Sequence, residues 1–259
     1  MNISKTHTLF FSATFSTKKI IRNIAAQFNN ENIEYEISGC NSETVQKLQA
    51  DDLLIVGVPV FSGRVPEIAV ESIKRFKGDS TPAILICVYG NRDFDDTLIE
   101  LKNIVCSNGF VPIAAASIVA QHSIFHQIAS NRPDDKDYIR INEFCTKVKS
   151  IIASTDSFDS SFDLSVKGNE PYRPIKNIPI HPSSGRLCDK CGACAKLCPV
   201  NAIPLDNPQK TDKTKCISCG RCIAVCPKKT RKYRGLLYML ANWKFKKNYS
   251  ERKEPDFFY

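Results

Sequence analysis

The first 150 residues alternate short apolar runs with longer segments in which apolar residues recur every three or four positions. Short apolar runs predict β-strands, and apolar residues at helical spacing predict amphipathic helices. The expected strands are 8–12, 33–37, 53–58, 83–88 and 111–119. The expected helices are 17–28, 44–48, 66–76, 94–108 and 134–153. Five strands and five helices in strict alternation predict an α/β domain over residues 1–154, with a doubly wound five-stranded parallel sheet.

The composition of the chain changes after residue 154. Residues 155–185 are rich in Ser, Asp, Pro and Asn and show little periodicity, which predicts an extended linker. Residues 186–228 hold eight of the twelve cysteines in two similar halves, which predicts a small second domain of α+β type. Residues 229–259 form a basic C-terminal extension. We therefore expect two domains that are joined by a linker and followed by a tail.

The eight clustered cysteines repeat one spacing twice. In each half, two residues separate each of the first three cysteines, and three residues precede the fourth, which is followed by proline. This spacing is typical of two 4Fe–4S clusters, in which the fourth cysteine of each half binds the cluster of the other half. The ligands predicted for the first cluster are Cys188, Cys191, Cys194 and Cys226. Those predicted for the second are Cys198, Cys216, Cys219 and Cys222.

Gly192 and Gly220 lie inside these loops, where the backbone must approach inorganic sulfide closely. A pair of zinc sites is the alternative, because paired cysteines also bind zinc. Zinc explains neither the third step of the repeat nor the trailing Cys-Pro. The segment closely resembles the bacterial two-cluster ferredoxin module over about 40 residues, with every ligand position intact.

A run of hydroxyl side chains follows the first predicted strand. Ser12, Thr14, Ser16 and Thr17 lie where this strand turns into a helix, and backbone N–H groups at a helix N-terminus bind phosphate. The loop lacks the lysine of nucleotide-hydrolysing P-loops, so it suits a phosphate monoester such as FMN. It resembles the phosphate loop of flavodoxins, Thr/Ser-x-Thr-Gly-x-Thr, which implies the strand order 2-1-3-4-5. Phe15 occupies the family's glycine position, where a positive φ would strain a bulky residue.

Two further loops follow the third and fourth predicted strands, at the sheet edge where such folds bind ligands. The resemblance to flavodoxins implies that these loops hold the isoalloxazine ring of FMN through aromatic faces, backbone groups and one cation. The candidate residues are Val60, Phe61, Gly63, Tyr89, Gly90, Asn91, Arg92 and Phe94. His122, beyond the fifth predicted strand, is expected to pack near the flavin edge, with proton handling as the alternative.

The chain as a whole resembles a family of fused flavodoxin–ferredoxin electron-transfer proteins, over about residues 8–228. The stretches that carry this resemblance are Gly63-Arg64-Val65-Pro66, Tyr89-Gly90-Asn91-Arg92, Ala114-Ala115-Ala116 and Ala120-Gln121-His122-Ser123. The resemblance implies a flavodoxin-like domain, a two-cluster ferredoxin domain, and three cofactors: FMN and two 4Fe–4S clusters.

The net charge of +9 belongs mainly to the tail, because residues 228–259 hold ten Lys or Arg and three Asp or Glu. Leu236, Leu237, Leu240 and Trp243 recur there at helical spacing. We expect a C-terminal helix that packs Leu240 and Trp243 onto the domains. A docking patch for an acidic redox partner and contact with a membrane surface are the alternatives. Basic amphipathic segments also bind nucleic acids, which we do not expect here.

The N-terminus has only a brief apolar patch at residues 9–11 and no small-residue cleavage site. No apolar run approaches the about 20 residues that span a bilayer. The cysteines are spaced as cluster ligands and not as a secreted disulfide framework. We therefore expect a cytoplasmic protein.

These features predict electron transfer between a two-electron flavin and one-electron clusters, with redox proteins as partners. One alternative is an iron–sulfur flavoenzyme that reduces a small organic acceptor at the FMN. Another is a non-catalytic scaffold with zinc-filled cysteines and a cofactor-free flavodoxin fold, which Phe15 alone favours. We identify no catalytic residues, and we expect an electron carrier in preference to a substrate-converting enzyme.

Overall fold

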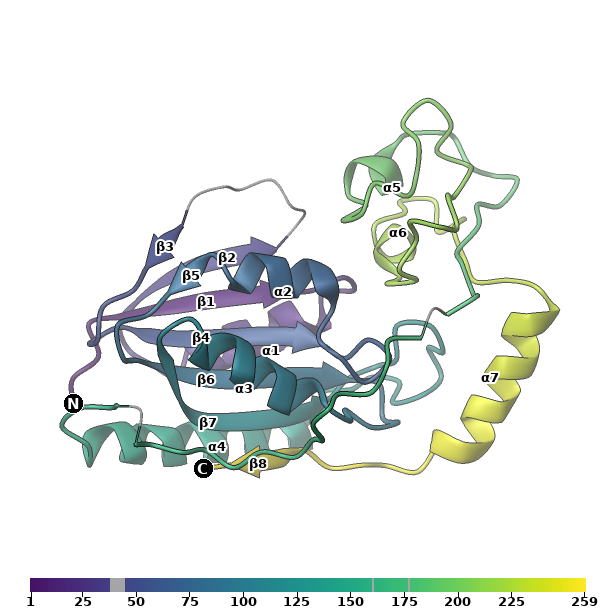
Figure 1. Ribbon diagram of the computed structural model, residues 1–259. Coiled ribbons are helices and arrows are strands. Elements are labelled where there is room, and N and C mark those ends of the chain that lie inside the picture. The colour runs from purple at the N-terminus through teal and green to yellow at the C-terminus, as the bar shows by residue number, and fades with distance from the viewer. Residues whose placement is uncertain (38–44, 160, 177) are drawn as a thin grey trace.

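A computed structural model describes residues 1–37, 45–159, 161–176 and 178–259. An α/β domain is followed by a cysteine-rich lobe and by a C-terminal segment that returns to the first domain (Figure 1). The strands are β1 (Lys5–Phe11), β2 (Glu31–Ile37), β3 (Gln46–Lys47), β4 (Leu53–Pro59), β5 (Phe76–Lys77), β6 (Thr81–Tyr89), β7 (Phe110–Val119) and β8 (Asp256–Phe258). The helices are α1 (Ser16–Ala25), α2 (Glu67–Ile73), α3 (Thr97–Cys106), α4 (Asp135–Ala153), α5 (Ala193–Lys196), α6 (Arg221–Ala224) and α7 (Leu236–Tyr249).

The main sheet has the order β2-β1-β4-β6-β7-β8. Its first five strands are parallel, and they correspond to the predicted strands in the predicted order 2-1-3-4-5. The prediction of a five-stranded sheet is wrong by one strand, because β8 of the C-terminal extension pairs antiparallel with β7. This pairing covers a sheet edge whose backbone groups would otherwise be exposed.

The helix predicted at 44–48 is wrong where the structure describes it. Gln46–Lys47 form β3, which pairs in parallel with β5 in a separate two-stranded sheet. Residue 44 lies outside the described residues. A segment this short carries too few periods to distinguish a helix from a strand.

Helices cover both faces of the main sheet. Ile20 of α1 and Phe144 of α4 pack on one face, in a cluster that includes Ile55 of β4. Leu101 of α3 packs on the other face together with α2, against Leu54 of β4. Strands β4 and β6 are apolar on both faces because both faces are covered.

The predicted linker is bound along the carboxyl end of the sheet. The carboxylate of Asp96 accepts hydrogen bonds from the backbone N–H groups of Asn169 (2.9 Å) and Arg173 (2.7 Å). Arg64 Nη1 donates to the carbonyl of Arg173 at 2.7 Å. These contacts hold the segment that leads into the cysteine-rich lobe against the first domain.

The predicted C-terminal helix exists as α7, but it packs through a different face. Leu240 and Trp243, which were expected to be covered, are 58% and 66% exposed. The covered side carries Tyr238 and Phe245, whose rings lie 5.9 and 4.5 Å from that of Phe125. Apolar residues lie on both faces of α7, so their spacing alone could not select the packed one. No helix in the described part of the chain is long and apolar enough to cross a membrane.

Candidate functional site

The loop between β1 and α1 holds Phe15 in the strained conformation that its position required. Phe15 is the N-cap of α1 and has a φ of 69°. Its ring stacks under the guanidinium of Arg221, 5.0 Å away, and Arg221 also pairs with Glu36 at 3.2 Å. Phe15 and Glu36 belong to the first domain and Arg221 to the cysteine-rich lobe. The residue in place of glycine therefore contributes to the contact between the two.

A small cavity of about 60 Å³ adjoins this loop. Thr14, Ser16 and Thr17 line it at the N-terminus of α1. Ser12 instead contacts the first turn of the helix, where its Oγ accepts a hydrogen bond from the N–H of Lys18 at 3.0 Å. Three hydroxyl residues at the positive end of a helix fit a phosphate monoester.

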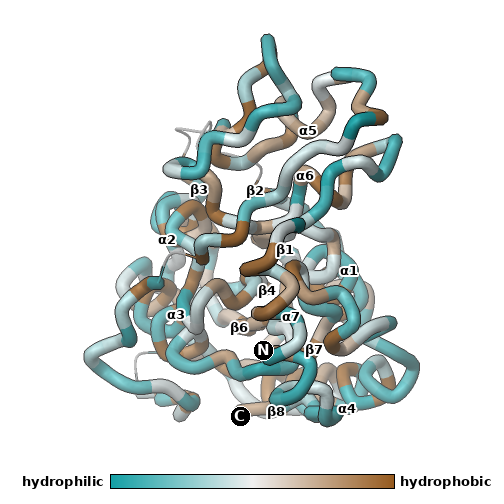
Figure 2. Tube along the Cα trace, turned by 90° about the vertical axis from the view of Figure 1, so that its right-hand side faces the viewer, coloured by the Kyte–Doolittle hydropathy of each residue, from teal (hydrophilic) through white to brown (hydrophobic). Residues whose placement is uncertain are grey.

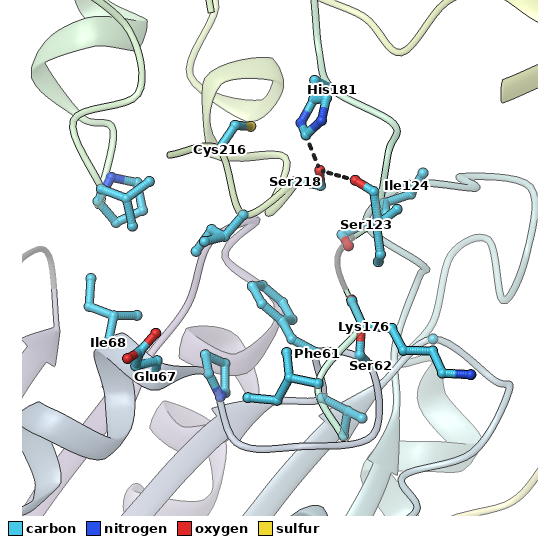
Figure 3. A pocket seen from close by; sticks show the side chains of 18 of the residues that line it. Phe61, Ser62, Glu67, Ile68, Ser123, Ile124, Lys176, His181, Cys216 and Ser218 are labelled. Carbon is cyan, nitrogen blue, oxygen red and sulfur yellow. Dashed lines mark hydrogen bonds between the residues drawn. The ribbon is translucent and has the colours of Figure 1, made fainter. Parts of the chain in front are cut away.

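A larger cavity of about 1200 Å³ lies between the carboxyl end of the sheet and the cysteine-rich lobe (Figure 3). Phe61 projects into it in Figure 3, from the side opposite Cys216 and Ser218. The two cavities are adjacent, because four residues of the predicted ring site line both of them. These residues are Val60, Phe61, Tyr89 and Gly90. An aromatic cavity beside a hydroxyl-lined pocket fits a flavin ring that carries a phosphate chain.

Gly63 and Arg92 also line the larger cavity, and both lie close to the carboxylate of Asp95. Gly63 has a φ of 81°, and a Cβ there would lie 2.3 Å from Asp95 Oδ2. Asp95 pairs with Arg92 and, at 2.5 Å, with Arg173 of the linker segment. Glycine is required here by the packing of the loop itself.

Asn91 and Phe94 lie outside the described walls of both cavities. Phe94 is buried in the core, with its ring 5.7 Å from that of Tyr89. The Asn91 amide donates to the carbonyls of Tyr249 (2.8 Å) and Glu251 (2.7 Å) in the C-terminal extension. The structure therefore shows a core role for Phe94 and a tethering role for Asn91.

His122 lines both cavities and has a defined hydrogen-bond pattern. Its Nδ1 accepts from the backbone N–H groups of Ile124 (3.0 Å) and Phe125 (3.2 Å), which assigns the proton of the neutral ring to Nε2. Burial, together with the nearby His126 and Arg92, lowers the pKa of His122 to about 4. At neutral pH the ring is therefore a neutral N–H donor at the cavity wall.

The two halves of the cysteine-rich lobe have matching backbones, as their sequence repeat predicts. Equivalent positions of the halves share left-handed φ angles: Lys190 (57°) with Ser218 (53°), Gly192 (76°) with Gly220 (81°), and Asn201 (51°) with Lys229 (51°). Each half also contains a single helical turn, α5 or α6. These turns wrap the cysteine loops.

The thiols of the predicted ligand sets influence one another electrostatically, but among the described residues no three His, Cys, Asp or Glu side chains are grouped so that they could hold a metal ion. The charges of Cys188 and Cys226 act on Cys194, and those of Cys198, Cys216 and Cys222 act on Cys219. The fourth cysteine of each half thus acts electrostatically on a thiol of the other half, and the two ligand sets remain a prediction. Cys191 is exposed at the outer side of the lobe.

Burial disfavours free thiolates at several of the cysteines. Burial raises the pKa of Cys219 to about 12 and that of Cys222 to about 11. Burial also acts to raise the pKa of Cys226, but hydrogen bonds from the Arg231 and Thr230 backbone and the Thr230 hydroxyl lower it overall. Because a metal binds the thiolate, assembly of a cluster must release these protons.

One predicted cluster site adjoins the predicted flavin site. Cys198 and Cys216 line the larger cavity, and Cys219 lines the smaller one. Cys219 also packs into the core of the first domain. At Gly220 a Cβ would lie 3.2 Å from both Thr14 Cγ2 and the Ser123 carbonyl, so the lobe contacts the phosphate loop directly.

Sequence reasoning missed the position of Arg231, which it assigned to the exposed basic tail. Arg231 is 1% exposed inside the lobe, with Nη1 3.8 Å from Cys194 Sγ. Its place five residues after Cys226 was the only signal in the sequence.

Residues 187–230 match the family model described as a 4Fe-4S dicluster domain. No curated protein matches the chain. Among solved structures, it is similar to the Fusobacterium nucleatum flavodoxin bound to flavin mononucleotide, at 12% identity over 57% of this chain and 99% of that one, with a TM-score of 0.43. The chain is similar to the oxidised flavodoxin 1 of Bacillus cereus at 15% identity, over 57% of this chain and 98% of that one, with a TM-score of 0.42. It is also similar to the rubredoxin oxygen:oxidoreductase of Desulfovibrio gigas, at 16% identity over 59% of this chain and 37% of that one, with a TM-score of 0.41.

These structural similarities are distant, and the fold class rests on the strand order. That order defines a flavodoxin-like domain, and the family model defines a 4Fe–4S domain after it. The chain therefore joins a flavodoxin-like fold to a 4Fe–4S dicluster domain.

Proposed function

We propose that this chain transfers electrons between FMN, bound at the carboxyl end of the sheet, and two 4Fe–4S clusters in the cysteine-rich lobe. The observation that carries the proposal is the shared cavity wall. Phe61 and Gly90 of the flavodoxin-like domain and Cys216 of the lobe border the same cavity. Electron transfer needs such proximity, and the packed linker and α6 maintain it.

Each residue group has a distinct part in this function. Thr14, Ser16 and Thr17 bind the phosphate of FMN, and Phe61 and Tyr89 contact its ring. His122 donates its Nε2 proton in a hydrogen bond at the ring edge. FMN exchanges two electrons, whereas each cluster exchanges one.

The predicted ligands of the second cluster support an order for the relay. Its ligands Cys198, Cys216 and Cys219 border the flavin cavities, so this cluster exchanges electrons with the flavin. The first cluster, held by Cys188 and its group, lies farther from these cavities and exchanges electrons with redox partner proteins of the cytoplasm.

The test begins with iron, sulfide and flavin analysis of protein purified without oxygen. We expect about eight iron per chain and FMN released on denaturation. Cys216→Ser should then slow electron exchange between the flavin and the remaining cluster, measured by stopped-flow absorbance, more than the matched variant Cys188→Ser. Protein that holds iron and sulfide but binds no FMN, even when FMN is added, would refute the proposal.

A second candidate is supported by the size of the larger cavity. At about 1200 Å³ it exceeds the roughly 300–1,000 Å³ typical of small-molecule sites, which leaves room for a small organic acceptor beside the flavin. An iron–sulfur flavoenzyme would reoxidise rapidly with such an acceptor and without a protein partner. Slow reoxidation by a panel of small acceptors, with fast reoxidation by redox proteins, would exclude it.

A further inference from the structure

Arg231 is a buried cation whose hydrogen-bond partners are all uncharged. Its Nη1 donates to the Pro208 carbonyl at 2.7 Å. Its Nη2 donates to the Pro182 carbonyl at 3.4 Å and to the Thr211 hydroxyl. The Nε atom is buried and has no partner. Among the described residues, no carboxylate forms an ion pair with this guanidinium.

A guanidinium remains charged in any protein environment, and an unpaired charge is strongly unfavourable in a protein interior. Burial of Arg231 therefore requires a negative group close to it. The nearest candidates are thiols: Nη1 donates to Cys194 Sγ at 3.8 Å, and while burial raises the pKa of Cys222, Arg231 acts to lower it. Cys194 belongs to the first predicted ligand set and Cys222 to the second.

We propose that Arg231 is the counter-ion shared by the two 4Fe–4S clusters and that it raises the reduction potential of both. An oxidised cluster with four thiolates carries a charge of about −2. When a reductant supplies one electron, this charge becomes about −3, and no bond forms or breaks. A fixed positive charge between the clusters stabilises the added electron on either of them. The partnerless Nε–H then has cluster sulfur as its acceptor.

This inference rests on the proposed ligation of two clusters, and it concerns a residue outside the stretch 187–230 that matches the dicluster family. Arg231 does not bind iron. It is a positioning and electrostatic residue, so its effect should appear in the potentials.

The experiment compares Arg231→Gln and Arg231→Lys with the wild-type protein by EPR-monitored redox titration with dithionite, after iron and sulfide analysis. Arg234→Gln is the matched control, because it removes the same charge three residues away from an exposed position. In Arg231→Gln the ratio of reduced to oxidised cluster at a fixed potential should fall about tenfold, which is about 59 mV for a one-electron couple. Arg231→Lys should restore most of this shift, and Arg234→Gln should change the ratio less than about twofold because water and salt screen it.

The outcomes separate this inference from the proposed function. Wild-type iron content in Arg231→Gln with both potentials unchanged would overturn the counter-ion role. If Arg231→Gln loses iron, retention of clusters at near-wild-type potentials in Arg231→Lys supports the role, and equal loss in both variants overturns it. Wild-type protein without iron and sulfide would instead overturn the proposed function itself.

A separate observation concerns the uncovered face of α7. Leu236, Met239, Leu240 and Trp243 recur at the spacing i, i+3, i+4, i+7 and are 71%, 64%, 58% and 66% exposed. Figure 2 faces the side of the molecule that carries α7, where apolar positions appear in brown. The helix contains three lysines and no acidic residue.

We infer that this face of α7 lies on the surface of an anionic lipid bilayer. Exposed Leu and Trp with flanking Lys are typical of interfacial helices, in which the ring sits at headgroup level and lysines reach anionic headgroups. Lysine is depleted at protein–protein interfaces, which disfavours a protein partner. The positive rims of two copies would repel each other, which disfavours a dimer through this face.

Trp243 is the single tryptophan of the chain, so its fluorescence reports on this surface alone. The anaerobic holoprotein should sediment with phosphatidylserine-rich vesicles and show a blue-shifted emission, and phosphatidylcholine vesicles should produce neither effect. Leu240→Ser should weaken binding about tenfold or less, whereas Ile139→Ser, at a 59% exposed position of α4, should not. Absence of sedimentation and of the blue shift with anionic vesicles, or a blue shift that accompanies dimerisation without lipid, would overturn the inference.

Discussion

The contact between Gly90 and His122 can be tested by a double-mutant cycle. Gly90 follows the end of β6, and a Cβ built on it would lie 2.5 Å from His122 Cδ2 and 2.7 Å from Cγ. The His122 ring cannot turn away without loss of its two backbone hydrogen bonds, at 3.0 and 3.2 Å. Gly90 does not have a positive φ, so the effect of Gly90→Ala should come from this collision and not from backbone strain.

We expect Gly90→Ala to destabilise the end of β6 by about 1–3 kcal/mol, the usual cost of overpacking. The displaced ring should also enter the cavity and weaken FMN binding by roughly 5–150-fold, which is the same free energy expressed as affinity. Native-state hydrogen exchange of the peptide around Tyr89 measures the first effect without unfolding the cluster domain. A fluorescence titration with FMN measures the second.

The decisive comparison repeats Gly90→Ala in a His122→Gly background, because the Cβ of His122 would itself lie 2.8 Å from the new Cβ. Removal of the whole side chain removes the collision, so the cost of Gly90→Ala should fall to about zero or reverse by about 0.4–1 kcal/mol, because alanine restricts the unfolded chain. An equal cost in both backgrounds would refute the steric account.

Three other results are expected. The pKa of His122 is about 4 in the folded state and 6.5 for the free side chain, so the unfolded state binds more protons between these two pH values. The midpoint of thermal unfolding should therefore fall as the pH drops from 6.5 to 4. A fall of the same size in His122→Gln would contradict this explanation. Glu100→Gln removes a buried carboxylate that accepts two hydrogen bonds from Arg64, both at 2.7 Å. It should lower the free energy of unfolding, measured with denaturant, by about 3–5 kcal/mol. The control Glu71→Gln, at an exposed ion pair, should lower it by less than about 1 kcal/mol. Asn91→Ala removes three hydrogen bonds to the C-terminal extension, so it should weaken the attachment of this segment by about 1.5–4 kcal/mol. The expected result is faster tryptic cleavage within the extension. Unchanged cleavage would show that β8 and other contacts, such as that of Arg252 with Asp134, are sufficient to hold it.

Features encoded in local spacing were predicted correctly. The five parallel strands follow from apolar runs such as 53–58, which can be buried on both faces only inside a parallel sheet. The cysteine repeat predicted two equivalent halves, and the matching φ angles of Gly192 and Gly220 are consistent with it. The positive φ of Phe15 was likewise required by its place in the loop.

Features that depend on contacts between distant segments were not predictable. β8 has three residues, too few for a periodic signal, and it becomes a strand because β7 offers it a free edge. Asn91 was assigned to the flavin by its loop, yet its amide binds the carbonyl of Tyr249, 158 residues away. Leu240 and Phe245 are both apolar positions of one helix, and only the location of Phe125 decides which of them is covered.

The sequence by itself determined the class of this protein, because ligand spacing and hydrophobic periodicity are local properties of the chain. It determined a parallel α/β sheet, a dicluster iron–sulfur segment and a basic C-terminal helix. The tertiary structure decided which cysteines border the cavity at the carboxyl end of the sheet, that Arg231 is buried in the lobe beside Cys194, and which face of α7 is exposed. Burial depends on what the rest of the chain brings alongside a residue, so a charged side chain in a basic tail and a buried counter-ion look the same in sequence.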